Sequence, residues 1–128
     1  MRRGFLLFAL FVAGVFYGWN RGISRDGLAR YIDAHPRTFK GDALLYTLGS
    51  FHELFNRPDR AVSMYERVVV LYPDSPHTEA CLYGVASNFE RLKNFARARQ
   101  EYEKYIEEYP EGRYAVSVKK NIEFLKGL

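Results

Sequence analysis

Prolines recur at a fixed interval of 37 residues in this chain of 128 residues, at Pro36, Pro73 and Pro110. Each proline closes a segment with a similar side-chain pattern. The two clearer segments contain Ala61, Tyr65, Val68, Val69 and Tyr72, and then Ala98, Tyr102, Tyr105, Ile106 and Tyr109. A repeat of this length indicates stacked supersecondary units that bury a continuous core between neighbours. It therefore favours an extended binding surface over a catalytic pocket.

The first half of each unit repeats as well. The matched positions are Leu45, Leu48, Gly49 and His52, and then Leu82, Val85, Ala86 and Phe89. Spacings of three, one and three residues place each set on one face of a helix. Each unit therefore predicts a first helix, helix A, followed by a second helix, helix B. The proline after helix B prevents the helix from continuing.

This pattern resembles the tetratricopeptide repeat over about residues 24–126. The positions that fit the frame of that family are Gly49, Ala61, Tyr65 and Pro73, and then Ala86, Ala98, Tyr102 and Pro110. The period exceeds the family's usual 34 residues, and the extra residues fall after Pro73. The joint there, Tyr-Pro-Asp-Ser-Pro, resembles bacterial envelope members such as the Tol-associated periplasmic protein and the β-barrel assembly lipoprotein. In this joint, Ser75 is the expected N-cap of the next helix.

The N-terminus has a different character. Residues 4–19 form an uncharged apolar run with Arg2 and Arg3 before it. Sixteen helical residues extend about 24 Å, close to a spanning length once flanking residues are added. A cleaved signal peptide is the alternative, but the run lacks the small residues of a cleavage site. A lipoprotein would need a cysteine just after the run, and the only cysteine is Cys81. We therefore predict a retained single-pass anchor in the inner (cytoplasmic) membrane, with the repeats on the periplasmic side.

These patterns predict an all-α protein, a short solenoid of helix pairs preceded by one transmembrane helix. The expected parts are an anchor over 1–21 and a helical domain over 22–128, the latter divided into a half-repeat 22–36, repeats 37–73 and 74–110, and a capping helix 111–128. Residues 1–40 carry a net charge of +5 and residues 41–128 one of −1. The basic excess thus lies beside the apolar run, where it either contacts anionic lipid or is a solvated linker. A nearly neutral repeat domain argues against nucleic-acid binding.

The sequence shows no catalytic or metal-binding pattern. The three histidines, His35, His52 and His77, lack the spacing of metal ligands. A single cysteine in an apolar stretch is typical of a small buried residue. No glycine-rich phosphate loop or nucleophile motif is present. We therefore predict a non-enzymatic protein with no cofactor, no metal and no small-molecule substrate.

The resemblance implies that the A helices line a concave face that binds partners. The positions that it assigns to this face are Tyr46, Ser50, Glu53, Tyr83, Ser87, Glu90 and Arg91. For the two tyrosines, partner contact and packing between helices both remain open. Arg91 and Lys120 are the only cations expected there, too few for the clamp with which related proteins grip a chaperone's C-terminal carboxylate. Phe124 lies off the apolar stripe of the last helix and is a further candidate for partner contact.

Two functions fit these features. In the first, the chain is a membrane-anchored interaction module that docks a partner protein or peptide on its A-helix face. In the second, it is a permanent accessory subunit of a membrane complex, with the anchor and the repeats both packed against other chains. Exposed aromatic side chains would favour the second.

Overall fold

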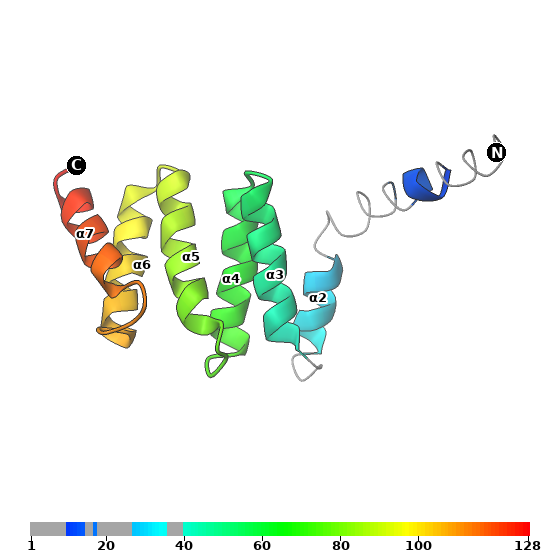
Figure 1. Ribbon diagram of the computed structural model, residues 1–128, viewed down its shortest axis with the longest axis horizontal. Helices are drawn as coiled ribbons and strands as arrows, with labels where there is room; N and C mark the ends of the chain where they lie inside the picture. Colours follow the sequence, from blue (N-terminus) through cyan, green and yellow to red (C-terminus); the bar gives the residue numbers. More distant parts are fainter. Residues whose placement is uncertain (1–9, 15–16, 18–26, 36–39) are drawn as a thin grey trace. The chain divides into compact units, whose positions relative to one another are not determined.

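The computed structural model describes residues 10–14, 17, 27–35 and 40–128. The chain divides into two compact units, Met1–Pro36 and Arg37–Leu128. Every regular element in the described residues is an α-helix (Figure 1). The all-α prediction is therefore confirmed for that part of the chain.

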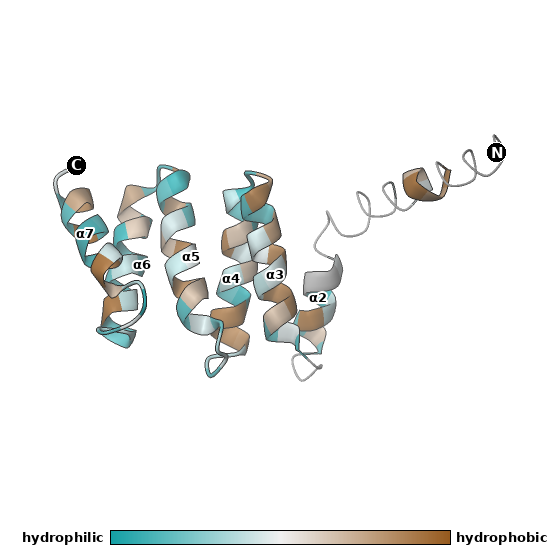
Figure 2. Ribbon diagram, viewed as in Figure 1, coloured by the Kyte–Doolittle hydropathy of each residue, from teal (hydrophilic) through white to brown (hydrophobic). Residues whose placement is uncertain are grey.

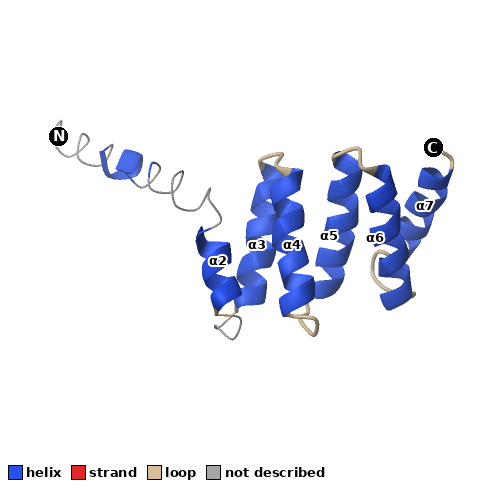
Figure 3. Ribbon diagram, turned by 180° about the vertical axis from the view of Figure 1, so that it is seen from behind, coloured by secondary structure: helices blue, strands red, loops and turns tan. Residues whose placement is uncertain are grey.

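The second unit is a row of five helices. They are α3 (Gly41–Leu54), α4 (Pro58–Leu71), α5 (Thr78–Arg91), α6 (Phe95–Glu108) and α7 (Ala115–Lys126). Each helix packs against the next one along the chain, and successive helices run in opposite directions (Figures 1 and 3). In the terms used above, α3, α5 and α7 are A helices, and α4 and α6 are B helices.

The two turns from helix A to helix B share one geometry. Asn56 and Lys93, which lie 37 residues apart, both have a left-handed backbone, with φ of 54° and 61°. The amide of each donates to a carbonyl three residues back, and the following amide donates to one five residues back. This is the Schellman arrangement that ends many helices. The A helices therefore stop at equivalent residues in both repeats.

The joints from helix B to helix A are longer. Each B helix is followed by a tyrosine and then a proline, Tyr72 and Pro73 after α4 and Tyr109 and Pro110 after α6. The N-cap prediction for Ser75 is wrong, because α5 begins only at Thr78. The Ser75 hydroxyl instead accepts a hydrogen bond from the His77 amide at 3.1 Å and donates to Asp42 of α3 at 2.6 Å.

Asp42 and Glu79 lie at the start of two A helices, and each accepts a hydrogen bond from a later joint. Asp42 holds the joint after α4 through Ser75. Glu79 accepts hydrogen bonds from the Tyr105 hydroxyl at 2.7 Å and from the Arg113 amide at 2.6 Å, in the joint after α6. The hydrogen bond from Ser75 holds the pKa of Asp42 below its usual value. Each of these carboxylates thus ties the start of an A helix to the joint that follows the next B helix.

The predicted stripes form the core of the stack. Leu45, Gly49, Leu82, Val85 and Ala86 are buried on the A helices. Ala61 and Ala98 on the B helices are completely buried. In the last helix the buried residues are the predicted stripe, Ala115, Val118, Ile122 and Leu125. Bands of apolar and polar residues alternate along these helices (Figure 2), as expected for helices with one buried face.

The buried Tyr65 ring of α4 lies against glycines of both flanking A helices. A Cβ atom built on Gly84 would lie 2.6 Å from Cε2 of the ring, and one built on Gly49 would also overlap it. The Tyr65 hydroxyl lies 3.2 Å from the Ser50 hydroxyl. Only glycine therefore leaves room for this ring on both sides.

Helix α7 ends the stack with a polar face. Three positions of the apolar stripe on α5 are polar in α7: Leu82, Ala86 and Phe89 are replaced one repeat later by Lys119, Glu123 and Lys126. A shallow groove of about 390 Å³ between α6 and α7 is lined mostly by charged side chains on this face. This chemistry suits a solvated cap, because charged groups are costly to bury against another helix.

We expect the Ala98→Leu variant to be less stable than the wild type. Ala98 is fully buried where α5 and α6 meet, so the added carbons should overpack this contact and cost about 1–3 kcal/mol. Ala96→Leu is the matched control, because Ala96 is exposed on the same helix. Thermal unfolding followed by circular dichroism measures both. Equal melting temperatures for the two variants would contradict the register of α6.

The first unit contains α2 (Gly27–Ala34), which falls within the predicted half-repeat 22–36. Residues 10–14 and Tyr17 are helical and exposed; the rest of the predicted anchor, residues 1–21, lies outside the described residues. None of the helices in the described part of the chain has the length and hydropathy of a membrane span. The anchor and the assignment of 22–36 to the repeat domain stay predictions.

Candidate partner-binding groove

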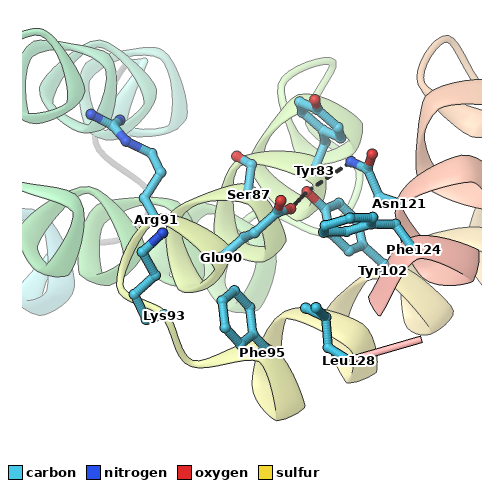
Figure 4. A pocket seen from close by; sticks show the side chains of 10 residues that line it. All are labelled: Tyr83, Ser87, Glu90, Arg91, Lys93, Phe95, Tyr102, Asn121, Phe124 and Leu128. Atoms are coloured by element: carbon cyan, nitrogen blue, oxygen red, sulfur yellow. Dashed lines mark hydrogen bonds between the residues drawn. The ribbon is translucent and has the colours of Figure 1, made fainter. Parts of the chain in front are cut away.

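An open groove of about 540 Å³ lies on the A-helix face of the second repeat (Figure 4). Four of the predicted partner-binding residues line it, all from α5: Tyr83, Ser87, Glu90 and Arg91. The other lining residues come from the α5–α6 turn, α6, α7 and the chain after α7; they are Lys93, Phe95, Tyr102, Asn121, Phe124 and Leu128.

Three hydrogen-bonded side chains form the polar part of the groove. The Tyr102 hydroxyl donates to Glu90 at 2.9 Å and accepts from the Asn121 side chain at 3.1 Å. Figure 4 shows this chain of contacts linking α5, α6 and α7. Burial of the ring, and then the hydrogen bond to Glu90, raise the pKa of Tyr102 above its usual value of 10. The phenol therefore remains a donor at neutral pH and fixes the Glu90 carboxylate in place.

Three apolar side chains also line the groove. The exposed fractions are 36% for Phe95, 61% for Phe124 and 70% for Leu128. Phe124 lines the groove from α7, three residues after Asn121 (Figure 4). Aromatic surface next to a few fixed polar groups is typical of the centre of a protein interface.

Two cations lie at one end of the groove. Arg91 extends away from Tyr102 (Figure 4) and donates to the amide oxygens of Asn56 at 3.1 Å and Asn88 at 3.4 Å. These partners carry no charge. The Lys93 ammonium lies 6.0 Å from the centre of the Phe95 ring. With Glu90, the groove thus carries two positive charges and one negative charge.

The three predicted residues of the first repeat do not line this groove. Tyr46, Ser50 and Glu53 lie on α3, and the side chains of Ser50 and Glu53 contact neighbouring helices. The Ser50 hydroxyl donates to the Tyr46 carbonyl at 3.1 Å and lies near the Tyr65 hydroxyl. Glu53 accepts a hydrogen bond from the Asn88 side chain of α5 at 2.5 Å. In the first repeat, α5 occupies the place that α7 occupies in the second repeat. The fully buried Asn88 of α5 joins this helix to α3.

The half-buried tyrosines on the A helices take part in packing. Tyr46 stacks on His77, with ring centres 4.7 Å apart and planes at 13°. Tyr83 stacks on Tyr114 in the same way, at 4.4 Å and 10°. His77 and Tyr114 directly precede α5 and α7, so each stack joins one A helix to the start of the next. Tyr83 nevertheless keeps part of its surface in the groove.

Sequence reasoning missed most of the groove outside α5. It singled out Phe124, but not Lys93, Phe95, Asn121 or Leu128, which come from other helices and from a turn. A comparison of repeats offers one signal, because Asn121 stands where the previous repeat has Gly84. The predicted cation Lys120 is exposed on α7 and is not part of the lining.

The described residues contain no cluster of histidine, cysteine and acidic side chains that could hold a metal ion. Cys81 is completely buried, and this burial is the main reason that its pKa rises to about 12. A thiol in that state is a poor nucleophile at neutral pH.

One comparison with known proteins identifies repeats in this chain. A family model described as tetratricopeptide repeat matches residues 42–75 and 80–112, just over half of the chain. The two matches cover the helix pairs α3–α4 and α5–α6. Neither the curated proteins nor the solved structures contain a match to the chain.

Proposed function

This chain belongs to the tetratricopeptide repeat family, and we propose that it is a membrane-anchored, non-enzymatic module that docks a partner protein through the groove between α5 and α7. The repeats themselves indicate protein–protein interaction. The observation that carries the rest is the groove, where exposed Phe124 lies next to the fixed Glu90–Tyr102–Asn121 chain. Such a surface combines apolar contact area with polar groups that orient a partner.

The lining suggests the chemistry of the partner segment. An apolar side chain would fit among Phe95, Phe124 and Leu128. Glu90 would accept a hydrogen bond from a donor on the partner, and Arg91 and Lys93 would attract a carboxylate. The opposite charges lie at different places in the groove, so a segment with both groups would bind in one direction only.

Membrane anchoring is supported by the uncharged apolar run at residues 4–19 and by the arginines before it. Lipid contact through that run would hold the repeats close to other membrane proteins. The Tyr-Pro-Asp-Ser-Pro joint supports an inner-membrane protein of the bacterial envelope, with the repeats on the periplasmic side.

The permanent-subunit function has an observation of its own. Phe55 and Phe124 are 55% and 61% exposed on the repeat unit, and large exposed aromatic residues are typical of surfaces that another chain covers. In this version the groove is filled at all times, and the partner does not dissociate.

One experiment on the full chain tests both the partner and the anchor. A photo-crosslinking amino acid at position 124 should capture a partner in isolated membranes, and the product should stay in the pellet after carbonate extraction. The same amino acid at position 116, exposed on α7 outside the groove, is the control. No product at 124, or equal products at both positions, would contradict the groove. Release of the chain by carbonate would contradict the anchor.

A further inference from the structure

The two ends of the repeat stack differ in charge. The α3–α4 and α5–α6 turns lie at one end, with the C-terminal end of α7, and the α4–α5 and α6–α7 joints lie at the other (Figures 1 and 3). Residues 54–57 and 91–95, at the turns, contain no carboxylate and three cations, Arg57, Arg91 and Lys93. Residues 72–77 and 108–114, at the joints, contain one cation and three carboxylates, Asp74, Glu108 and Glu111.

The turn end also carries most of the exposed apolar side chains. Residues 41–128 contain nine large apolar residues that are exposed, and six of them lie at this end: Leu54, Phe55, Leu92, Phe95, Phe124 and Leu128. Leu54 is 80% exposed. Leu54, Phe55 and Leu92 do not line the groove, so the groove does not account for their exposure.

The cations at this end are not neutralised by the contacts that hold them. Arg91 donates to the uncharged amides of Asn56 and Asn88. Glu53 and Glu90, on the A helices, accept hydrogen bonds within the stack, from Asn88 and Tyr102. Asp59, two residues after Arg57, is the one exposed carboxylate in the first turn of α4, and the three cations outnumber it. The turns therefore present positive charge and apolar side chains together.

We infer that the turn end of the repeat stack is a docking surface for an anionic lipid bilayer. Apolar side chains on successive turns can enter the headgroup layer, while neighbouring cations bind lipid phosphates. Each cation near an anionic surface contributes about fivefold to the binding constant, and the acidic joints would be repelled. This surface goes beyond the proposed partner groove, because it uses Leu54, Phe55, Arg57 and Leu92, which lie outside it.

A fluorescent label can test this in the full chain reconstituted into vesicles. The native Cys81 is completely buried, with its pKa raised to about 12, so an environment-sensitive thiol dye should react only with an introduced cysteine. Leu92→Cys places the dye at the turn end, and Pro76→Cys places it in an exposed position of the opposite joint. The vesicles are phosphatidylcholine alone or phosphatidylcholine mixed with phosphatidylglycerol. Some of the lipids carry a spin label that quenches the dye.

We expect quenching at position 92 only in the anionic vesicles, with loss at high salt, and none at position 76. Arg57→Gln with Lys93→Asn should lower the docked fraction, with the docking constant reduced about fivefold for each cation removed; asparagine suits the left-handed backbone at position 93. Absence of quenching at 92, or equal quenching at 92 and 76, would overturn the inference. A change in the fluorescence of the dye at position 92 with soluble polyglutamate, but not with anionic vesicles, would also overturn the inference. It would show that the surface binds an acidic protein. These outcomes are read from lipid quenching and do not require a partner to be captured at position 124, so this inference and the proposed function can fail separately.

Discussion

Tyr65→Ala should destabilise the repeat unit more than any other single truncation considered for this chain. The Tyr65 ring is 3% exposed and lies against Gly49 of α3 and Gly84 of α5. Its removal would leave a cavity at the contact of three helices, because two glycines cannot fill the space. Truncation of a large buried aromatic residue costs about 3–5 kcal/mol. This loss is a large fraction of the stability of a small domain, which is about 5–15 kcal/mol.

Tyr65→Phe is the matched control. It keeps the ring and removes the hydroxyl with its contacts to Ser50 and Glu53, so we expect a loss of about 1 kcal/mol. Urea unfolding of the full chain in detergent, followed by the circular dichroism of the helices, measures both variants. Similar stabilities for Tyr65→Ala and the wild type would show that the ring does not fill the space between α3 and α5.

The 37-residue period predicted most of the fold. The helix pairs repeat because residues 37 positions apart have the same structural role. Ala61 and Ala98 lie at helix contacts, and Pro73 and Pro110 follow the B helices. The stripe of the last helix was predicted for the same reason. The start of α5 was not predicted correctly, because a serine such as Ser75 can either cap a helix or form a hydrogen bond with a distant carboxylate. The hydrogen bond to Asp42, 33 residues earlier, decides between these alternatives and leaves no local pattern.

The candidate groove was predicted only in part. The period places Tyr83, Ser87, Glu90 and Arg91 on one helix face, and these residues do line the groove. The equivalent positions of the first repeat have other neighbours, because α5 packs there and Glu53 bonds to Asn88. Sequence equivalence therefore does not make the two surfaces equivalent.

The remaining lining residues depend on how the turns and the last helix lie across the repeats. Phe95 is exposed at the start of α6 and lies outside its buried stripe, and Leu128 follows the end of α7. The stacks of Tyr46 on His77 and of Tyr83 on Tyr114 likewise depend on the joint geometry. A helical period predicts which face a residue occupies, but not which residues of another helix lie opposite it.

Phe124→Ala should remove the partner without affecting the fold. Phe124 is 61% exposed and lines the groove, so its truncation leaves no internal cavity. An aromatic residue at the centre of an interface contributes about 2 kcal/mol or more, which is a loss of about thirtyfold in affinity. Tyr83→Ala should also weaken binding, but it removes the stack on Tyr114 as well and is the less selective change.

The affinity of the captured partner for the full-length chain in detergent is the most direct measurement of whether the groove between α5 and α7 is the docking surface. The account predicts a dissociation constant about thirtyfold higher for Phe124→Ala than for the wild type, with the same helix content. It predicts an unchanged constant for Val116→Ala, on the same helix outside the groove, and for charge reversal at Glu107 on α6. An unchanged constant for Phe124→Ala, with a large loss at Glu107, would contradict it and place the docking surface on the B-helix side.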